Sequence, residues 1–574
     1  FIDKIEEVTD YVEEELKKDT SKIEMKYLKA KFLNSLAEKR VGEEFLKNNP
    51  GTTVIIKPFY GGNRYYMFTQ KVYPDVRMVG APPSSIGKFG ADTDNWKWPR
   101  HTGDFSIFRV YADSLGNPAP YDTSNVPLRP KKYFDLSIRG VRENDFVMLM
   151  GFPGRTNHFY TPIEVQERKN IENQIRINIR DLRQRLLLNA MLADPKVRIQ
   201  YAGKYASSTN SYKSSKGMNT MIERQSTEYL KERQMNELLN WGWDNDIQEY
   251  REAVDIIAHE VKKRATLKIR KQYLLDAIWI GTEFSPEPTK IDALKKGLNG
   301  NDSTRKAALE DFDRLYYKFY NRDYAPEVDR RIAKAMLKMY ADSIAPEHYP
   351  AFFKTIDKKH KGNIGKYVDH LFESSLFADP QKYEKWKKRP NIKALEKDGM
   401  VQYARSIKEE AQRINQALSS IENEITNAQK HYIAGQLMLH EDKPNYPDAN
   451  FTIRLTYVQV KSYSPSNAVT YNFETTLDGV MEKENPTNWE FVVDKKLKDL
   501  YQRKDFGFYI NESGKMPVNF IANTHTTGGN SGSPVLNARG ELVGINFDRN
   551  WEGITGDIQY QGNYQRSIIT DIRY

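Results

Sequence analysis

Cysteine is absent from the 574-residue chain, and histidine is scarce, with 9 residues and none before His101. Without cysteine the chain has no disulfides, no thiolate zinc sites, no iron–sulfur clusters and no cysteine nucleophile. Long hydrophobic runs are also missing. Mean hydropathy is −0.73, and no apolar stretch approaches the roughly 18 residues needed to cross a bilayer. The sequence therefore predicts no membrane span and excludes thiol chemistry.

Apolar and charged residues are both plentiful. Hydrophobic residues make up 39% of the chain, with 35 Tyr and 26 Phe, which is enough for large cores and excludes wholesale disorder. Lys and Arg number 87 against 77 Asp and Glu, giving a net charge of +10. A nucleic-acid-binding module would gather its basic residues in stripes, whereas here acids are interleaved, as in residues 13–18. We therefore expect no nucleic-acid partner.

The pattern of residues along the chain changes twice. Short β-rich segments with turns run from about residue 52 to 153, helical periodicity prevails from about 162 to 439, and strands return from about 446. Residues 1–49 fit a helix, because apolar residues recur there at steps of three and four. A polar, Ser- and Lys-rich loop is expected over residues 203–217, and a strand over 507–510. The simplest architecture is a β domain interrupted by one large helical insertion.

The most specific motif is TTGGNSGSPV at residues 526–535. The pattern G-x-S-G-S-P followed by a β run resembles the nucleophile segment of chymotrypsin-like serine peptidases. By this resemblance Ser531 attacks the substrate, and the backbone N–H groups of Gly529 and Ser531 hold the developing oxyanion. Glycine lets the backbone turn tightly enough to aim both amides at one point. The alternative is an ordinary Gly/Ser-rich loop.

Residues 533–537 and 541–547 predict a β-hairpin around a Gly-containing turn. If Asn537 pairs with Glu541, counting back places Ser531 opposite Phe547. Asp548 and Arg549 then lie beside the nucleophile, where chymotrypsin-like enzymes build the wall of the pocket for the substrate side chain. The alternative is a surface turn with local ion pairs.

A serine nucleophile also needs a base and a carboxylate that orients the base. The candidate carboxylate is Asp104, which opens an alternating strand over residues 105–111. The alternative is an Asp in an ordinary turn, which is common. The sequence contains no H-E-x-x-H, no P-loop and no G-x-G-x-x-G, so we expect neither a metal ion nor a cofactor.

Three long motifs together resemble the bacterial S46 dipeptidyl peptidases: GADTDNWKWPRHTGDF at 90–105, GFPGRTN at 151–157, and residues 528–552. The resemblance covers nearly the whole chain. It implies a chymotrypsin-like double β-barrel, an all-β catalytic domain, interrupted by a large all-α insertion that acts as a lid. Residues 1–157 would be the first barrel, 158–442 the insertion and 443–574 the second barrel. The implied activity is a serine exopeptidase that releases dipeptides from free peptide N-termini.

The resemblance also assigns roles to residues. Asp104 is the acid of the triad and Ser531 the nucleophile, while Asn95, Trp96 and Asp548 anchor the α-amine of the substrate. A partly protonated amine needs such a carboxylate and oxygen acceptors. Arg549 marks the branch that cleaves after Asp or Glu, because guanidinium grips a carboxylate bidentately. The branch with broad, hydrophobic preference, which carries Gly there, is the alternative.

The base histidine is where the sequence departs from the family. In this fold it precedes the triad acid, within a Thr-Asn-His-His-Cys segment, and no such segment occurs here. His101 is too close to Asp104 along the chain, and His525 lies where the fold puts the specificity pocket. We expect the base in a segment upstream of Phe1; the alternative is a non-catalytic peptide-binding relative. The resemblance further implies a homodimer in the periplasm or at the surface of a Gram-negative bacterium.

Overall fold

The computed structural model describes residues 1–21 and 23–574. These separate into two compact units. Unit 1 consists of Phe1–Pro162, Thr220–Ile257 and Ile425–Tyr574, and unit 2 of Ile163–Asn219 and Ala258–Glu424. Three of the four division points fall within the long helices α8 (Pro195–Arg224), α10 (Gln248–Tyr273) and α18 (Gly399–Leu439), and the fourth lies at the start of α6 (Pro162–Glu167). The division into residues 1–157, 158–442 and 443–574 stays a prediction.

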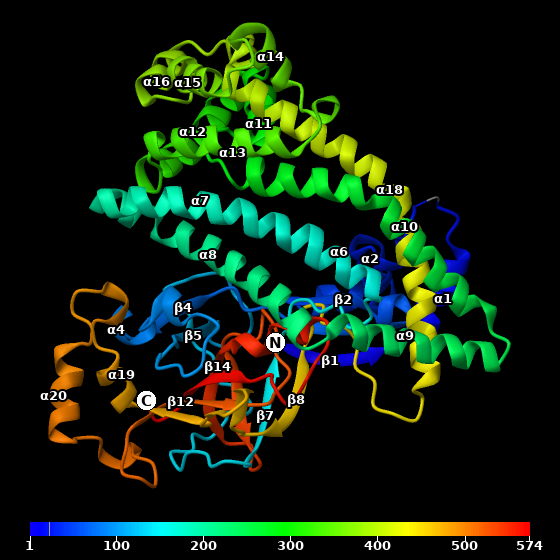
Figure 1. The fold of residues 1–574 in the computed structure, drawn as a ribbon, viewed down its shortest axis with the longest axis vertical. Helices are drawn as coiled ribbons and strands as arrows, with labels where there is room; N and C mark the ends of the chain where they lie inside the picture. Colours follow the sequence, from blue (N-terminus) through cyan, green and yellow to red (C-terminus); the bar gives the residue numbers. More distant parts are fainter. Residues whose placement is uncertain (22) are drawn as a thin grey trace. The chain divides into compact units, whose positions relative to one another are not determined.

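The main element of unit 1 is a seven-stranded antiparallel sheet in the order β11-β12-β15-β14-β13-β7-β8 (Figure 1). Strand β7 precedes the helical stretch in sequence, yet it pairs with β13 and β8, which follow that stretch. An isolated antiparallel bridge between Val460 and Ala522 links the end of β8 to β12. The strands are β7 (Phe146–Gly151), β8 (Arg454–Gln459), β11 (Glu474–Thr476), β12 (Pro517–Ala522), β13 (Ser533–Asn537), β14 (Leu542–Arg549) and β15 (Ser567–Asp571).

The core of this sheet is made of aliphatic and aromatic side chains. Val147 and Leu149 of β7 are fully buried, as are Val535 of β13 and Ile569 of β15. Along β7 buried residues alternate with less buried ones, because successive side chains of a strand point to opposite faces, whereas β12 and β15 are buried at every position. The sheet therefore holds the ends of β13 and β14 in place, next to the predicted nucleophile.

Unit 1 also contains smaller sheets. One has the order β1-β3-β2 and packs against α1 and α2, and another has the order β4-β5-β6. Strands β9 and β10 form a hairpin. The bounds are β1 (Ile2–Glu7), β2 (Thr52–Phe59), β3 (Arg64–Lys71), β4 (Val76–Gly80), β5 (Ile107–Ala112), β6 (Val126–Pro127), β9 (Tyr463–Ser466), β10 (Val469–Tyr471), α1 (Thr9–Lys18) and α2 (Ala30–Val41).

Two local predictions for unit 1 were wrong. Residues 1–49 do not begin with a helix, because Ile2–Glu7 forms β1 and pairs with β3, and these hydrogen bonds outweigh the local periodicity. Residues 507–510 do not form a strand: Gly507–Tyr509 is a 3₁₀ helix with Phe508 exposed. The remaining short helices are α3 (Glu43–Asn48), α4 (Ser84–Gly87), α5 (Ala91–Asp94), α9 (Thr227–Asp244), α19 (Leu477–Glu482), α20 (Lys495–Arg503) and the 3₁₀ helix η8 (Trp551–Asp557).

Unit 2 is built from helices around a large aromatic and aliphatic core. The predicted loop over residues 203–217 was wrong, because these residues lie inside α8. Their small polar side chains face α7: Arg180 donates to Ser208 at 3.0 Å, and Arg176 donates to Ser215 at 3.2 Å. Tertiary packing thus overrides weak helix propensity. The helices are α6 (Pro162–Glu167), α7 (Gln174–Ala193), α11 (Pro288–Leu298), α12 (Asp302–Arg322), α13 (Pro326–Ser343), α14 (Phe352–His360), α15 (Ile364–Ser374), α16 (Pro380–Lys388) and α17 (Ile392–Lys397), with π-helical turns at Arg168–Asn173 and Leu274–Trp279.

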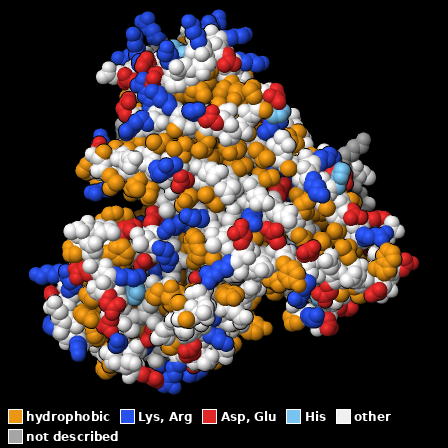
Figure 2. Space-filling model, in the orientation of Figure 1, with side chains coloured by type: hydrophobic (Ala, Val, Ile, Leu, Met, Phe, Trp, Pro, Cys, Tyr) orange, Lys and Arg blue, Asp and Glu red, His pale blue; other side chains and the backbone are white. Residues whose placement is uncertain are grey.

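The surface carries mixed charge. On the face that Figure 2 shows, Lys and Arg side chains are interspersed with Asp and Glu, and no stripe of one sign is seen there. Among the described helices, none has both the length and the hydrophobicity that a membrane crossing requires.

Candidate active site

Ser531 lies on the turn that leads into β13, and its side chain is exposed. Its Oγ donates a hydrogen bond to the carbonyl oxygen of Phe547 at 3.2 Å. The neighbouring Asn530 is buried and holds the turn: its Oδ1 accepts from the Thr527 N–H at 3.0 Å, and its carbonyl accepts from Asn546 Nδ2 at 3.0 Å. A rigid, buried asparagine therefore presents an accessible serine hydroxyl.

Gly529 shapes the backbone beside Ser531. Its φ is +105°, and a Cβ there would lie 2.5 Å from the carbonyl oxygen of Phe152 and 2.8 Å from the nitrogen of Gly154, so only glycine fits. Within the described part of the chain, neither the Gly529 N–H nor the Ser531 N–H has a protein acceptor. Two unpaired donors next to a serine hydroxyl meet the chemical requirement of an oxyanion site. Their use as such stays a prediction.

The hairpin that carries these residues is present with one irregularity. The Asn537 N–H donates to the Glu541 carbonyl at 2.9 Å, as the predicted pairing requires. The register then shifts between Val535 and Leu536, so Ser533 pairs with Asn546 instead of the residue expected from counting. Such a bulge adds one residue to one strand. Ser531 still bonds to Phe547 through its side chain, and Asp548 and Arg549 follow at the end of β14.

The structure brings Trp96 and Asp548 together across 452 residues of sequence. The Trp96 N–H donates to Asp548 Oδ2 at 3.3 Å, and the Arg549 N–H donates to Asp548 Oδ1 at 2.7 Å. Trp96 has a positive φ of +65°, a conformation that costs roughly 1–3 kcal/mol and is found mainly where the surroundings impose it. Asn95 immediately follows α5 and is adjacent to Trp96 in the chain.

Arg100 is a site residue that the sequence analysis missed. Its Nη1 donates to Asp548 Oδ2 at 2.8 Å and to the Asp94 carbonyl at 2.7 Å, and both side chains of the Arg100–Asp548 pair are almost fully buried. A buried carboxylate is expected to have a cationic partner. The position of Arg100 within the motif at residues 90–105 was a usable signal, but the sequence alone does not say which carboxylate it meets.

Arg549 is the last residue of β14 and is 4% exposed. Its Nη1 donates to the Thr526 carbonyl at 3.0 Å and to Asp557 Oδ1 at 2.8 Å. Its guanidinium carbon is 5.5 Å from the centre of the Trp96 ring, within cation–π range. Asp557, at the end of η8, is the second residue that the sequence analysis missed.

Asp104 is positioned through its neighbour Thr102. Asn519, fully buried in β12, accepts from the Thr102 N–H at 2.8 Å and donates to the Thr102 carbonyl at 2.9 Å. Asp104 is exposed, but nearby protein atoms exclude part of the surrounding water and so raise its pKa; Arg100 opposes this effect and the negative charge of Asp548 reinforces it. No described residue forms a hydrogen bond with the Asp104 carboxylate, and no described contact joins it to Ser531.

His101 and His525 do not contact Ser531 or Asp104 within the described residues. His101 is buried, and a Cβ on Gly479 would lie 2.0 Å from its Nε2; burial lowers its pKa to about 3. His525 Nε2 is 2.9 Å from the Gly556 carbonyl oxygen and 3.2 Å from His158 Nε2. Burial, followed by the effect of His158, lowers the pKa of His525 to about 4.

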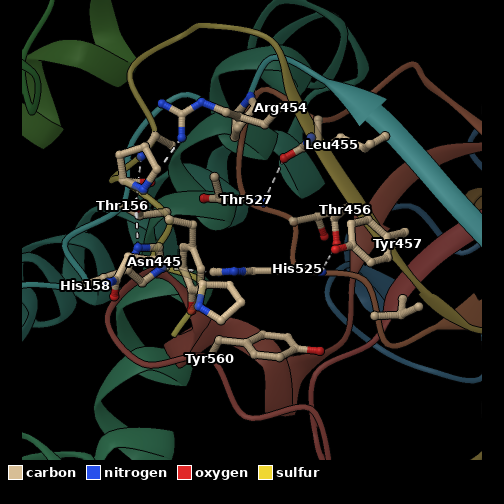
Figure 3. A pocket seen from close by; sticks show the side chains of 18 residues that line it. Thr156, His158, Asn445, Arg454, Leu455, Thr456, Tyr457, His525, Thr527 and Tyr560 are labelled. Atoms are coloured by element: carbon tan, nitrogen blue, oxygen red, sulfur yellow. Dashed lines mark hydrogen bonds between the residues drawn. The ribbon is translucent and has the colours of Figure 1, made fainter. Parts of the chain in front are cut away.

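His525 instead lines a cavity of about 390 Å³ beside the nucleophile segment (Figure 3). Asp448 Oδ1 accepts from the backbone N–H of the facing His158 at 2.7 Å and lies 2.9 Å from its Nδ1, and Tyr560 stacks on His525. Thr527 and Asn530 form part of the cavity wall, so the cavity and the serine turn share residues. Ser531 is not among the residues that line it.

An exposed serine hydroxyl beside two unpaired backbone N–H groups is typical of enzymes that transfer acyl groups through serine. The chain belongs to the Peptidase S46 family, whose profile matches residues 1–574. The resemblance inferred from the three motifs is thereby confirmed.

Individual relatives match over the whole chain. The Asp/Glu-specific dipeptidyl-peptidase of Porphyromonas gingivalis is 52% identical over 575 residues, covering 100% of this chain and 80% of that protein. Dipeptidyl-peptidase 7 of Phocaeicola vulgatus is 43% identical, with 100% of this chain and 80% of that protein covered. The crystal structure of Porphyromonas endodontalis DPP11 in complex with the dipeptide Arg-Glu matches with a TM-score of 0.93 at 46% identity, covering 100% of this chain and 82% of that chain. The combination of sheets with a large helical portion is thus confirmed.

Proposed function

We propose that this protein is a serine exopeptidase that releases dipeptides from the free N-terminus of peptides and prefers Asp or Glu as the second residue. The observation that carries the proposal is the placement of Asp548 and Arg549 next to the Ser531 turn. A carboxylate suits the substrate α-amine, and a buried guanidinium suits an acidic side chain one residue further on. The names of the Porphyromonas relatives, and the Arg-Glu and Arg-Asp dipeptides in the P. endodontalis structures, support it.

The chemistry would proceed through an acyl-enzyme. Ser531 Oγ bonds to the carbonyl carbon of the second residue, while the N–H groups of Gly529 and Ser531 stabilise the oxyanion. A base takes the hydroxyl proton and passes it to the leaving amine as the C–N bond breaks. Water then hydrolyses the ester and frees the dipeptide. Asp104 would orient the base; no described histidine contacts Ser531.

The proposed scaffold is a double β-barrel. The Val460–Ala522 bridge supports closure of the run from β12 to β8 into one barrel. The sheets β1-β3-β2 and β4-β5-β6 would belong to the other. The insertion of residues 158–442 as a lid, a homodimeric assembly and a periplasmic or cell-surface location are further proposals that rest on the family resemblance, and sedimentation and cell fractionation test the last two.

The testing experiment uses the full-length gene product and fluorogenic dipeptide substrates that end in Asp, Glu, Leu or Arg, each with a free and a blocked N-terminus. Cleavage of only the free Asp and Glu substrates is the expected result. Cleavage of Leu substrates at a similar rate would favour the broad specificity of the dipeptidyl-peptidase 7 type. No cleavage, together with retained dipeptide binding, would favour a non-catalytic peptide-binding relative.

A further inference from the structure

The guanidinium of Arg549 already has a carboxylate partner within the chain. Asp557 faces its two terminal nitrogens end-on, with Oδ1 2.8 Å from Nη1 and Oδ2 3.3 Å from Nη2. The Thr526 carbonyl takes a further hydrogen bond from Nη1 at 3.0 Å. This edge of the guanidinium is therefore occupied before any substrate arrives.

The other edge of the same guanidinium, formed by Nε and Nη2, includes a donor without a described partner. Arg549 Nε is buried and has no hydrogen-bond partner among the described residues. A buried donor without an acceptor is costly, and such groups in proteins call for an explanation. Nε and Nη2 point along one side of the planar group, in the geometry that grips a carboxylate with two parallel hydrogen bonds. This edge thus has the chemistry of an acidic side-chain receptor.

Asp557 is held firmly enough to act as a fixed partner. Its carbonyl oxygen accepts from the Asn157 N–H at 2.6 Å. Burial alone would raise the pKa of Asp557, but the charge of Arg549 and hydrogen bonds from Arg549 and Thr527 lower it overall, so the pair is ionic at neutral pH. Gly553 packs closely against the Arg549 side chain, because a Cβ there would lie 3.2 Å from Cγ of Arg549. The guanidinium plane consequently has little freedom to turn.

We propose that Asp557 is a positioning residue for specificity: it holds Arg549 end-on, so that Nε and Nη2 present a side-on edge to the acidic second residue of the substrate. This inference rests on the proposed function and adds a residue to it. Substrates with an apolar second residue make no use of that edge, so their cleavage does not depend on Asp557.

The test is Asp557→Asn, measured as kcat/KM on dipeptide substrates ending in Asp, Glu and Leu. The asparagine amide places an N–H₂ group against Nη1 or Nη2, so the guanidinium turns and its side-on edge is lost. We expect a fall of at least tenfold for Asp and Glu substrates, mainly through KM, and a change within twofold for Leu. Asp557→Glu, which keeps the charge, is expected to recover part of the loss.

Glu552→Gln is the matched control. Glu552 lies on the same 3₁₀ helix and loses the same charge, but its carboxylate bonds to Tyr463 at 2.9 Å and to Asn550 at 3.0 Å instead of Arg549. Glu552→Gln should change the ratio of kcat/KM for Glu substrates to kcat/KM for Leu substrates by no more than twofold. If activity proves too low to compare, binding of Arg-Glu and Arg-Leu dipeptides to variants in a Ser531→Ala background, by calorimetry, gives the same comparison.

Parallel measurement of Arg549→Gly separates the two claims. If Arg549→Gly keeps the preference for Asp and Glu, the proposed pocket itself fails. If Arg549→Gly removes that preference but Asp557→Asn leaves it unchanged, only the role of Asp557 is overturned. An equal fall for all three substrates with Asp557→Asn would show a merely structural residue and would also overturn the inference.

Discussion

Arg100 and Asp548 form a buried ion pair, 2.8 Å between Nη1 and Oδ2, that joins the motif at residues 90–105 to the end of β14. The same Asp548 oxygen accepts from the Trp96 N–H. Asp548 therefore reaches its place through contacts with a segment more than 400 residues away in the chain. The proposed amine anchor is thus a product of tertiary structure, and its carboxylate is paired with the buried cation of Arg100.

Replacing that cation should destabilise the protein. Arg100→Met leaves the Asp548 carboxylate buried without its partner, which costs about 3–5 kcal/mol in comparable buried pairs. Urea unfolding followed by circular dichroism measures the change. Arg539→Met is the control, because its ion pair with Glu541 is exposed at the hairpin turn and should matter little. Equal effects of the two substitutions would contradict the structural role of Arg100.

The close approach of Gly529 to Phe152 and Gly154 makes a kinetic prediction. In Gly529→Ala the new Cβ would clash with backbone atoms, so the amide must move away from the oxyanion position. Losing one such donor lowers kcat by roughly 10²–10³-fold with a small effect on KM. Gly528→Ala is the comparison, since a Cβ there meets nothing within 4 Å. A kcat within threefold of the parent for Gly529→Ala would remove Gly529 from the oxyanion site.

Arg549 should determine the preference for acidic residues. Arg549→Gly is expected to lower kcat/KM for Asp and Glu substrates at least about 10²-fold relative to Leu, because the substrate carboxylate would be desolvated without a partner. Arg549→Lys should not restore the activity, since an ammonium lacks the planar fork. Competition assays with mixed Glu and Leu substrates give the ratio directly. An unchanged ratio in either variant would refute the pocket.

Acidification should destabilise unit 1 through its buried histidines. The pKa values of His101 and His525 are lowered, chiefly by burial, to about 3 and about 4 from an ordinary value of 6.5. Between these values and 6.5 the unfolded chain binds more protons than the folded one, so stability is lost as pH falls through that window. Within this window each histidine lowers the free energy of unfolding by up to about 1.4 kcal/mol for every unit by which the pH falls. Urea unfolding at pH 7, 6, 5 and 4 gives the free energy of unfolding at each pH. This free energy should fall less steeply with decreasing pH in His101→Gln than in the parent, and an equal fall in both would contradict the prediction.

Most of what could be predicted about the fold and the candidate site came from the sequence motifs. The turn residues between Asn537 and Glu541 were enough to predict the hairpin, because turn chemistry is local. The shift between Val535 and Leu536 was not predictable, since it depends on how β13 and β14 pair with β7 and β15. The same limit explains the missed residues. Arg100 and Asp557 become site residues only through long-range pairing, and a sequence does not show which distant charges meet.

Local patterns also failed where packing supplies the missing energy. The Ser-rich stretch at 203–217 lacks an apolar stripe, yet Arg176 and Arg180 of α7 donate hydrogen bonds to its hydroxyl groups and keep it helical. The spacing of apolar residues in Ile2–Glu7 does not by itself distinguish a helix from a strand. Pairing with β3 stabilises the strand. In both cases the deciding contact lies on another element.

The position of β7 beside β13 has a consequence for synthesis. β7 lies between β13 and β8, and the segment that follows β7 supports the Gly529 turn. A ribosome makes β7 early and the serine turn only near the end of these 574 residues, so a nascent chain passes most of its elongation with this sheet incomplete. The turn that carries the proposed nucleophile therefore gains its support from the segment after β7 only late in synthesis.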